Sequence, residues 1–167
     1  YNNALSMIND AIDIVSSSKK SDMMADALIR RSIINMAIGD RDGASSSFEL
    51  AMIFLSFVPE AYSLRAELYQ CMAKNMYEQK KYREALNFSL QSLLYIDSMP
   101  ITNNELLYNA YNSIGSCYSN LNLKHSYFDS SIYYMKKQLD LCLDVYGEHH
   151  TKSAHAYFQL ASSMSNH

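Results

Sequence analysis

A short phrase of small and large residues recurs along this chain and limits its fold more than any other feature. The phrase opens on a small residue, carries in most copies an apolar residue four positions on, and closes on a small or polar residue three positions later. Its copies are Ala4…Ile8…Ala11, Ala44…Phe48…Ala51, Ala85…Ser89…Ser92 and Ser131…Met135…Gln138. They begin 40, 41 and 46 residues apart. A recurrence at this spacing is typical of stacked helical repeats, in which each unit packs on its neighbours.

The composition is consistent with helices and excludes several classes of partner. Only four Gly and two Pro occur among 167 residues, which favours long helices over a turn-rich β fold. The net charge is −3, and basic residues occur as isolated pairs rather than in a block, so we expect no direct nucleic-acid binding. No run of eighteen apolar residues is present, so we expect no membrane span in this segment.

Three widely spaced cysteines, Cys71, Cys117 and Cys142, argue against a disulfide framework. We expect reduced, buried thiols, which weakly favour a cytoplasmic location. The chain begins at Tyr1 and shows no signal peptide, so we expect it to be part of a longer protein.

The spacing of apolar residues predicts an all-α fold of about eight antiparallel helices. Glycine and proline divide them: the segment 39–43 is expected to form a tight turn, and Pro59 is expected to open the fourth helix. The predicted helices cover residues 3–17, 21–38, 44–57, 59–79, 82–96, 103–121, 125–146 and 151–164.

The fourth and fifth predicted helices carry a pattern that resembles a tetratricopeptide (TPR) repeat. In a unit that starts at Ala66, the matching residues are Tyr69, Met72, Ala73, Met76, Tyr77, Tyr82, Ala85 and Leu86. The next unit matches at Tyr111, Ile114, Gly115 and Tyr118, and the last at Tyr157, Leu160 and Ala161. The segment 147–151 is similar to the turn of the longer repeats of kinesin light chains, with His149 in place of Asp and Thr151 in place of Pro.

The resemblance implies one solenoid domain over residues 1–167, with further repeats or another domain outside it. We expect a half repeat at 1–20, repeats at about 22–58, 60–99 and 103–146, and a half repeat at 150–167. The third repeat carries about four extra residues near 123–127. The first repeat is ambiguous by one residue, because Arg31 falls at an apolar place while Ile29, Ile33 and Met36 form a better stripe. A helical-hairpin stack of another family is the structural alternative.

The resemblance also implies a function as a protein- or peptide-binding scaffold, with the partner on a concave face lined by the first helix of each repeat. The candidate groove residues are Glu67, Gln70, Lys74, Tyr77, Asn109, Asn112, Ser116 and His155, with Asn120 beside them. The same places elsewhere hold Asp26, Ile29, Ile33, Met36, Ser119, Phe158, Ser162 and Ser165.

Asn109 and Asn112 are three residues apart and share a helix face, where their amides match the donors and acceptors of a peptide backbone. A solvated polar face is the other interpretation of these residues. The two-Lys, two-Asn clamp of chaperone-binding relatives is not reproduced by Lys74 with this pair, so that partner is not carried over.

Two other classes of function remain open at this point. A metal-dependent enzyme would use the region of His149, His150 and His155, but the spacing suits metal binding poorly and no HExxH or CxxC occurs. We therefore expect no catalytic residues, no metal and no cofactor. The chain could instead serve as the sensor or dimerisation domain of a bacterial signal-transduction or transcription-regulatory protein. Apolar residues on the end helices would allow a homo-oligomer.

Overall fold

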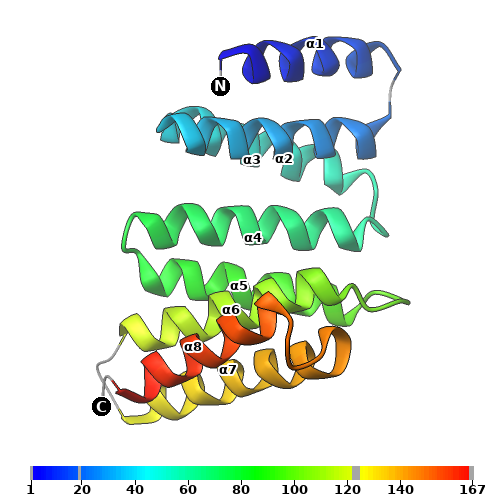
Figure 1. Ribbon diagram of the computed structural model, residues 1–167. Helices are drawn as coiled ribbons and strands as arrows, with labels where there is room; N and C mark the ends of the chain where they lie inside the picture. Colours follow the sequence, from blue (N-terminus) through cyan, green and yellow to red (C-terminus); the bar gives the residue numbers. More distant parts are fainter. Residues whose placement is uncertain (1, 19, 122–124, 166–167) are drawn as a thin grey trace.

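Eight α-helices make up the computed structural model, which describes residues 2–18, 20–121 and 125–165. They stack in order from α1 at one end of the molecule to α7 and α8 at the other (Figure 1). This confirms the all-α prediction. The helices are α1 (Asn2–Ser18), α2 (Ser21–Ile38), α3 (Arg41–Ser56), α4 (Tyr62–Glu78), α5 (Tyr82–Asp97), α6 (Asn104–Leu121), α7 (His125–Tyr146) and α8 (Thr151–Ser165).

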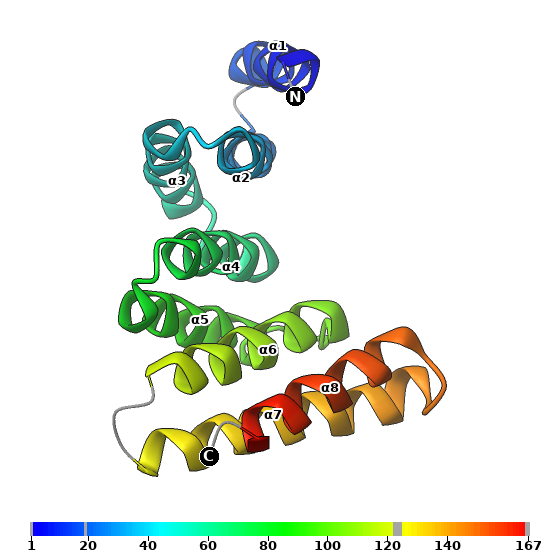
Figure 2. The ribbon, with the colours of Figure 1, turned by 60° about the vertical axis from the view of Figure 1, so that its left-hand side comes forward.

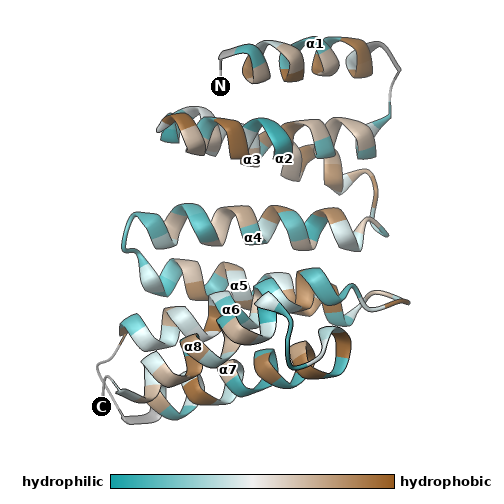
Figure 3. Ribbon diagram, in the orientation of Figure 1, coloured by the Kyte–Doolittle hydropathy of each residue, from teal (hydrophilic) through white to brown (hydrophobic). Residues whose placement is uncertain are grey.

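The helices are paired as a helical-hairpin solenoid requires. We call α2, α4 and α6 the first helices and α3, α5 and α7 the second helices, because α2 packs on α3, α4 on α5 and α6 on α7. Figure 2 shows α2 and α3 nearly end-on and next to each other. The first helices also contact one another, α2 with α4 and α4 with α6. Hydrophilic and hydrophobic residues are interspersed along each helix (Figure 3), as expected of helices that bury only part of their surface. Within the described ranges, no helix is long and apolar enough to cross a lipid bilayer.

The recurring phrase lies where the second helices meet their neighbours. Its opening residues Ala44, Ala85 and Ser131 are all completely buried. Serine in the phrase still permits close contact, because its hydroxyl bonds to a neighbouring backbone: Ser131 Oγ donates to the Gly115 carbonyl oxygen at 2.9 Å. Ala4, the opening residue of the α1 copy, is exposed instead, because no described helix covers that face of α1.

Gly115 allows α6 and α7 to approach closely. A Cβ atom at this position would lie 2.9 Å from Cγ of Met135, which is closer than real side chains come. Ala73 occupies the equivalent place in α4, a helix that packs on α5, and is completely buried. The small residues that the repeat pattern requires at this place are therefore confirmed as contacts between helices.

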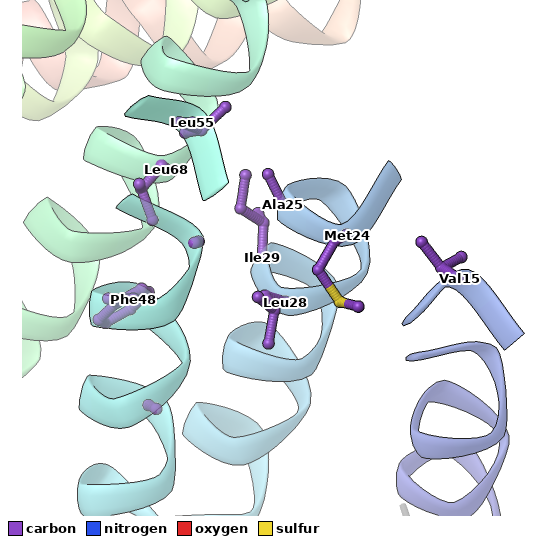
Figure 4. Packing of buried hydrophobic residues seen from close by; sticks show 10 residues of the cluster. Val15, Met24, Ala25, Leu28, Ile29, Phe48, Leu55 and Leu68 are labelled. Carbon is purple, nitrogen blue, oxygen red and sulfur yellow. The ribbon is translucent and has the colours of Figure 1, made fainter. Parts of the chain in front are cut away.

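The packing of α2 resolves the one-residue ambiguity in the register of the first repeat. Ile29 is completely buried and belongs to a core cluster with Leu55 of α3 and Leu68 of α4 (Figure 4). On the other side of α2, Met24 reaches Val15 of α1. The prediction that Ile29 faces a partner is therefore wrong, because its side chain fills the space between three helices.

Two predicted helix boundaries are also wrong. The turn expected at 39–43 is shorter, since α3 begins at Arg41 and the Asp40 carboxylate caps it by accepting a hydrogen bond from the Gly43 amide at 2.9 Å. Gly39 has the positive φ of 82° that ends α2. Pro59 lies in the turn before α4, which begins only at Tyr62. The expected insertion near 123–127 falls partly outside the described residues.

A pair of isoleucines on α2 tests this assignment. We expect Ile29→Ala to lower the free energy of unfolding by about 2–5 kcal/mol, because it leaves a cavity in the core. Ile33, which is 37% exposed, should cost about 1 kcal/mol or less on the same change. Urea unfolding followed by circular dichroism measures both values. Equal losses for the two variants would show that α2 is turned differently.

Candidate functional site

An open groove of about 720 Å³ runs across the first helices. Its walls come from α2, α4 and α6, with one residue from α8. The lining residues are Arg30, Ile33, Met36, Glu67, Gln70, Cys71, Lys74, Tyr77, Glu105, Leu106, Asn109, Asn112, Ser113, Ser116 and Gln159.

Helical spacing brings these side chains to one surface. In α4, most lining residues are three or four positions apart, so they lie above one another on one side of the helix. The same holds for Asn109, Asn112 and Ser116 in α6. On the opposite side of each helix, residues such as Ala73 and Gly115 are buried in the core. Their burial sets the rotation of the helix about its own axis and so determines which residues face the groove.

Seven of the eight groove residues predicted from the sequence line this one cavity. They come from α4 and α6, and they are Glu67, Gln70, Lys74, Tyr77, Asn109, Asn112 and Ser116. The structure thus brings the predicted set together, while their part in binding stays a prediction.

His155 is the predicted residue that does not line the groove. Its Nδ1 lies 2.8 Å from the hydroxyl of Tyr108, which draws the imidazole toward α6. Its Nε2 lies 3.2 Å from Nε2 of Gln159, one turn further along α8. Gln159 is the α8 residue that reaches the groove. His155 therefore contacts a lining residue rather than the cavity itself.

The sequence interpretation missed several lining residues. Arg30 lines the groove where Ile29 was expected, while Ile33 and Met36 line it as predicted. Some of the missed residues could have been found from their positions in the sequence. Arg30, Cys71 and Ser113 each follow a predicted residue by one position, so a wider face on each first helix would have included them.

Hydrogen bonds and an ion pair join the first helices along the groove. Arg30 Nη2 lies 2.7 Å from Oε2 of Glu67, which links α2 to α4. Gln70 Nε2 donates to the carbonyl oxygen of Leu106 at 2.8 Å, and Asn120 Nδ2 donates to the hydroxyl of Tyr77 at 2.9 Å. These two bonds link α4 to α6. The groove is therefore held in shape by its own side chains as well as by the core beneath it.

The two halves of the groove differ in chemistry. On the α2 side, Ile33 and Met36 present apolar surface beside Cys71. On the α6 side, the lining carries amides and hydroxyls, and Oδ1 of Asn112 is buried without a hydrogen-bond partner. Lys74 adds a positive charge, and its Nζ lies 4.0 Å from the carboxylate of Glu78. This arrangement offers apolar contact at one end and hydrogen bonds at the other.

The groove lining lacks an activated nucleophile. Burial, with a smaller effect from the charge of Glu67, raises the pKa of the Cys71 thiol to about 11. Burial also raises the pKa of the Tyr77 hydroxyl. Both groups therefore stay protonated near neutral pH, whereas a reactive cysteine needs a lowered pKa.

The histidines of the enzyme alternative are engaged separately. The ring of His150 stacks on Tyr146 with centroids 4.8 Å apart, while His155 bonds to Tyr108. Across the described residues, no group of three or more His, Cys, Asp or Glu side chains is placed to hold a metal ion.

Comparisons with known proteins give a fold but no close relative. No family model matches the sequence, and no curated protein matches it. Among solved structures, BtubC (BKLC) from P. vanneervenii gives a TM-score of 0.80 over 99% of this chain at 14% sequence identity. The chain spans 66% of that protein, slightly less than two thirds of its length.

A putative kinesin light chain from Podosopora anserina, with nearly identical TPR-like repeats, is similar as well. It gives a TM-score of 0.69 at 11% identity, and a variant of it with one substitution gives 0.71 at 12% identity. Each match covers 98% of this chain and 77% of the other. At such low identities the likeness establishes the fold, and the chain is a TPR-like helical-repeat solenoid.

Proposed function

We propose that this chain is a non-enzymatic binding module that holds a peptide segment of a partner protein in the groove of the first helices. The observation that carries the proposal is the groove itself, where residues at matching repeat positions of α2, α4 and α6 line a single cavity. Its volume of about 720 Å³ is in the range of ligand sites. Helical solenoids commonly use such extended concave surfaces for binding.

The amide half of the groove favours an extended backbone over a helical one. A helix satisfies its own backbone groups, whereas an extended peptide leaves N–H and C=O groups free to bond. Asn109 and Asn112 line the groove, and each amide carries a donor and an acceptor. The N–H and C=O groups of an extended peptide match the donors and acceptors of these two amides.

The remaining lining supports side-chain recognition. On the α2 side, Ile33 and Met36 provide apolar surface for a side chain of the peptide. Methionine suits such a surface because its flexible thioether adapts to different shapes. The ion pair of Arg30 with Glu67 leaves Lys74 as the more open charge of the lining, since its own pairing distance is 4.0 Å.

The amide pair can be tested with peptides selected from a random display library on the immobilised chain. We expect Asn109→Ala/Asn112→Ala to weaken binding of the selected peptides by about tenfold or more, because two hydrogen bonds of about 1 kcal/mol each are lost. Fluorescence anisotropy of a labelled peptide measures the affinity.

The matched control for the amide pair is Asn87→Ala/Gln91→Ala on α5. Both control residues are amides of a second helix and neither lines the groove. An undiminished affinity in the Asn109/Asn112 variant, or an equal loss in the control, would count against the proposed site.

The thiol of Cys71 provides an independent test of occupancy. Because its pKa is raised to about 11, we expect alkylation by iodoacetamide to be slow at neutral pH and to speed up roughly tenfold per pH unit up to that pKa. A bound peptide should slow the reaction of Cys71 and leave Cys117, which is completely buried outside the groove, unchanged. Peptide mapping by mass spectrometry reads each cysteine separately. Full reactivity of Cys71 at saturating peptide would place the ligand elsewhere.

A further inference from the structure

The helix α8 differs from the other helices of the groove in how it is held. α2 packs on α4 and α4 on α6, whereas within the described residues α8 packs closely only on α7. α7 runs on to Tyr146, three residues further past the buried opening of its phrase than α3 and α5 run past theirs. α8 therefore begins almost one turn further along, and side chains rather than packed backbones bridge the space to α6.

Polar side chains make up this bridge. Lys152 contacts the carboxylate of Glu105, and its Nζ lies 5.0 Å from the ring centroid of Tyr108. Nδ1 of His155 lies 2.8 Å from the hydroxyl of Tyr108. Lys152, His155 and Gln159 are three and four positions apart, so they share one face of α8, and Gln159 on this face lines the groove. Hydrogen bonds and charge therefore carry much of the hold of α8 on α6.

His150 caps the first turn of α8 with its ring. Its carbonyl oxygen accepts the first helical hydrogen bond, from the amide of Ala154 at 3.1 Å, which identifies it as the N-cap residue. Its Nδ1 accepts another from the amide of Lys152 at 3.1 Å, and the ring stacks on Tyr146. A ring nitrogen accepts only while it carries no proton. Protonation would therefore remove the cap and place a positive charge at the helix N-terminus, where the helix dipole disfavours it.

His155 depends on the same neutral form. The amide nitrogen of Gln159 lies 3.2 Å from its Nε2 and can only donate, so Nε2 is the acceptor. This leaves Nδ1 as the donor to the hydroxyl oxygen of Tyr108. A proton on Nε2 would turn its contact with Gln159 into two donors that face each other. It would also place a positive charge three positions from the ammonium of Lys152 on the same helix face.

The groups around the two rings do not offset an added charge. Glu105 faces them from α6, and its carboxylate is already paired with Lys152. Burial raises the pKa of the Tyr108 hydroxyl on α6 and of the Cys142 thiol on α7, so both groups stay neutral. The acidic and basic residues of the adjoining turn and the end of α7 are exposed, where solvent screens their charge, and they are Asp144, Glu148 and His149.

We propose that α8 is a pH-sensitive wall of the groove. With both rings neutral, the cap of His150 and the bonds of His155 hold α8 against α6 and keep Gln159 in the groove lining. Histidine gains its proton between about pH 8 and pH 5. Over this range α8 loses its cap, its rings repel Lys152, and its first turns are released from α6, so the groove opens at this end. The inference concerns α8 itself and does not rest on the proposed peptide binding.

Hydrogen exchange of the unliganded full chain tests the proposal, because it measures local opening helix by helix. Mass spectrometry follows the exchange at pH 8 and pH 5.5, with times adjusted for the intrinsic pH dependence of amide exchange. In the wild type we expect the amides of α8 to lose protection at pH 5.5 by at least about fivefold, the usual order for the loss of one cap. The amides of α4 and α5 should keep theirs.

The variant His150→Asn/His155→Gln separates this switch from a general effect of acid. Asn is among the best N-cap residues and Gln offers a donor and an acceptor, but neither titrates, so α8 should stay protected at both pH values. His149→Asn, at the exposed neighbour, is the matched control and should behave as the wild type. If circular dichroism shows the double variant to be less helical, His150→Asn alone takes its place and should lose less protection than the wild type.

Two results would overturn the proposal. One is equal protection of α8 in the wild type at pH 8 and pH 5.5. The other is an equal loss on acidification in the wild type and in the variant without the titrating rings.

Discussion

The close contact between the first and second helix of each pair is the constraint on which the rest of this molecule depends. Two helices can approach closely where one of them carries a small residue at the crossing, so that the side chains of the other have room. Gly115 meets this condition, since even one added carbon would collide with Met135 of α7, and the completely buried Ala73 stands at the same place of α4. Because the backbones are so close, serine hydroxyls such as that of Ser131 bond directly to the facing helix and are satisfied inside the core.

These contacts determine which side of each first helix remains free. Once Ala73 is buried in the core, the residues at three- and four-residue spacing on the other side of α4 face the groove. The bonds from Arg30 to Glu67 and from Gln70 to Leu106 then hold neighbouring first helices together across that surface. The groove is therefore a consequence of the core, and its shape does not depend on loops.

The sequence was sufficient to predict the groove residues of a first helix when a small apolar residue marked the side that packs on the second helix. It was insufficient for α2, which has no such residue. In α4 and α6, Ala73 and Gly115 fixed the helix phase, and seven groove residues followed. In α2 the buried small residue is Ser32, whose hydroxyl bonds to the Ile29 carbonyl at 2.6 Å. A serine in a helix gives no clear sign of burial, so the neighbouring isoleucines could not be assigned to core or groove. The sequence also could not show which side chains bond to distant parts of the fold. His155 is at a groove position of its helix, but it forms a hydrogen bond with the hydroxyl of Tyr108, 47 residues away in the chain, and does not line the cavity.

The repeats are alike where their helices pack together and different where their side chains are exposed. At one groove place the three first helices carry Ile33, Lys74 and Ser116, which are apolar, charged and hydroxylic in turn. At one outer place the second helices carry Ile53, Leu94 and Asp140. Packing requires none of these differences, because the buried residues already satisfy it. The side chains of the groove and of the outer face can therefore vary without altering the contacts that hold the solenoid together.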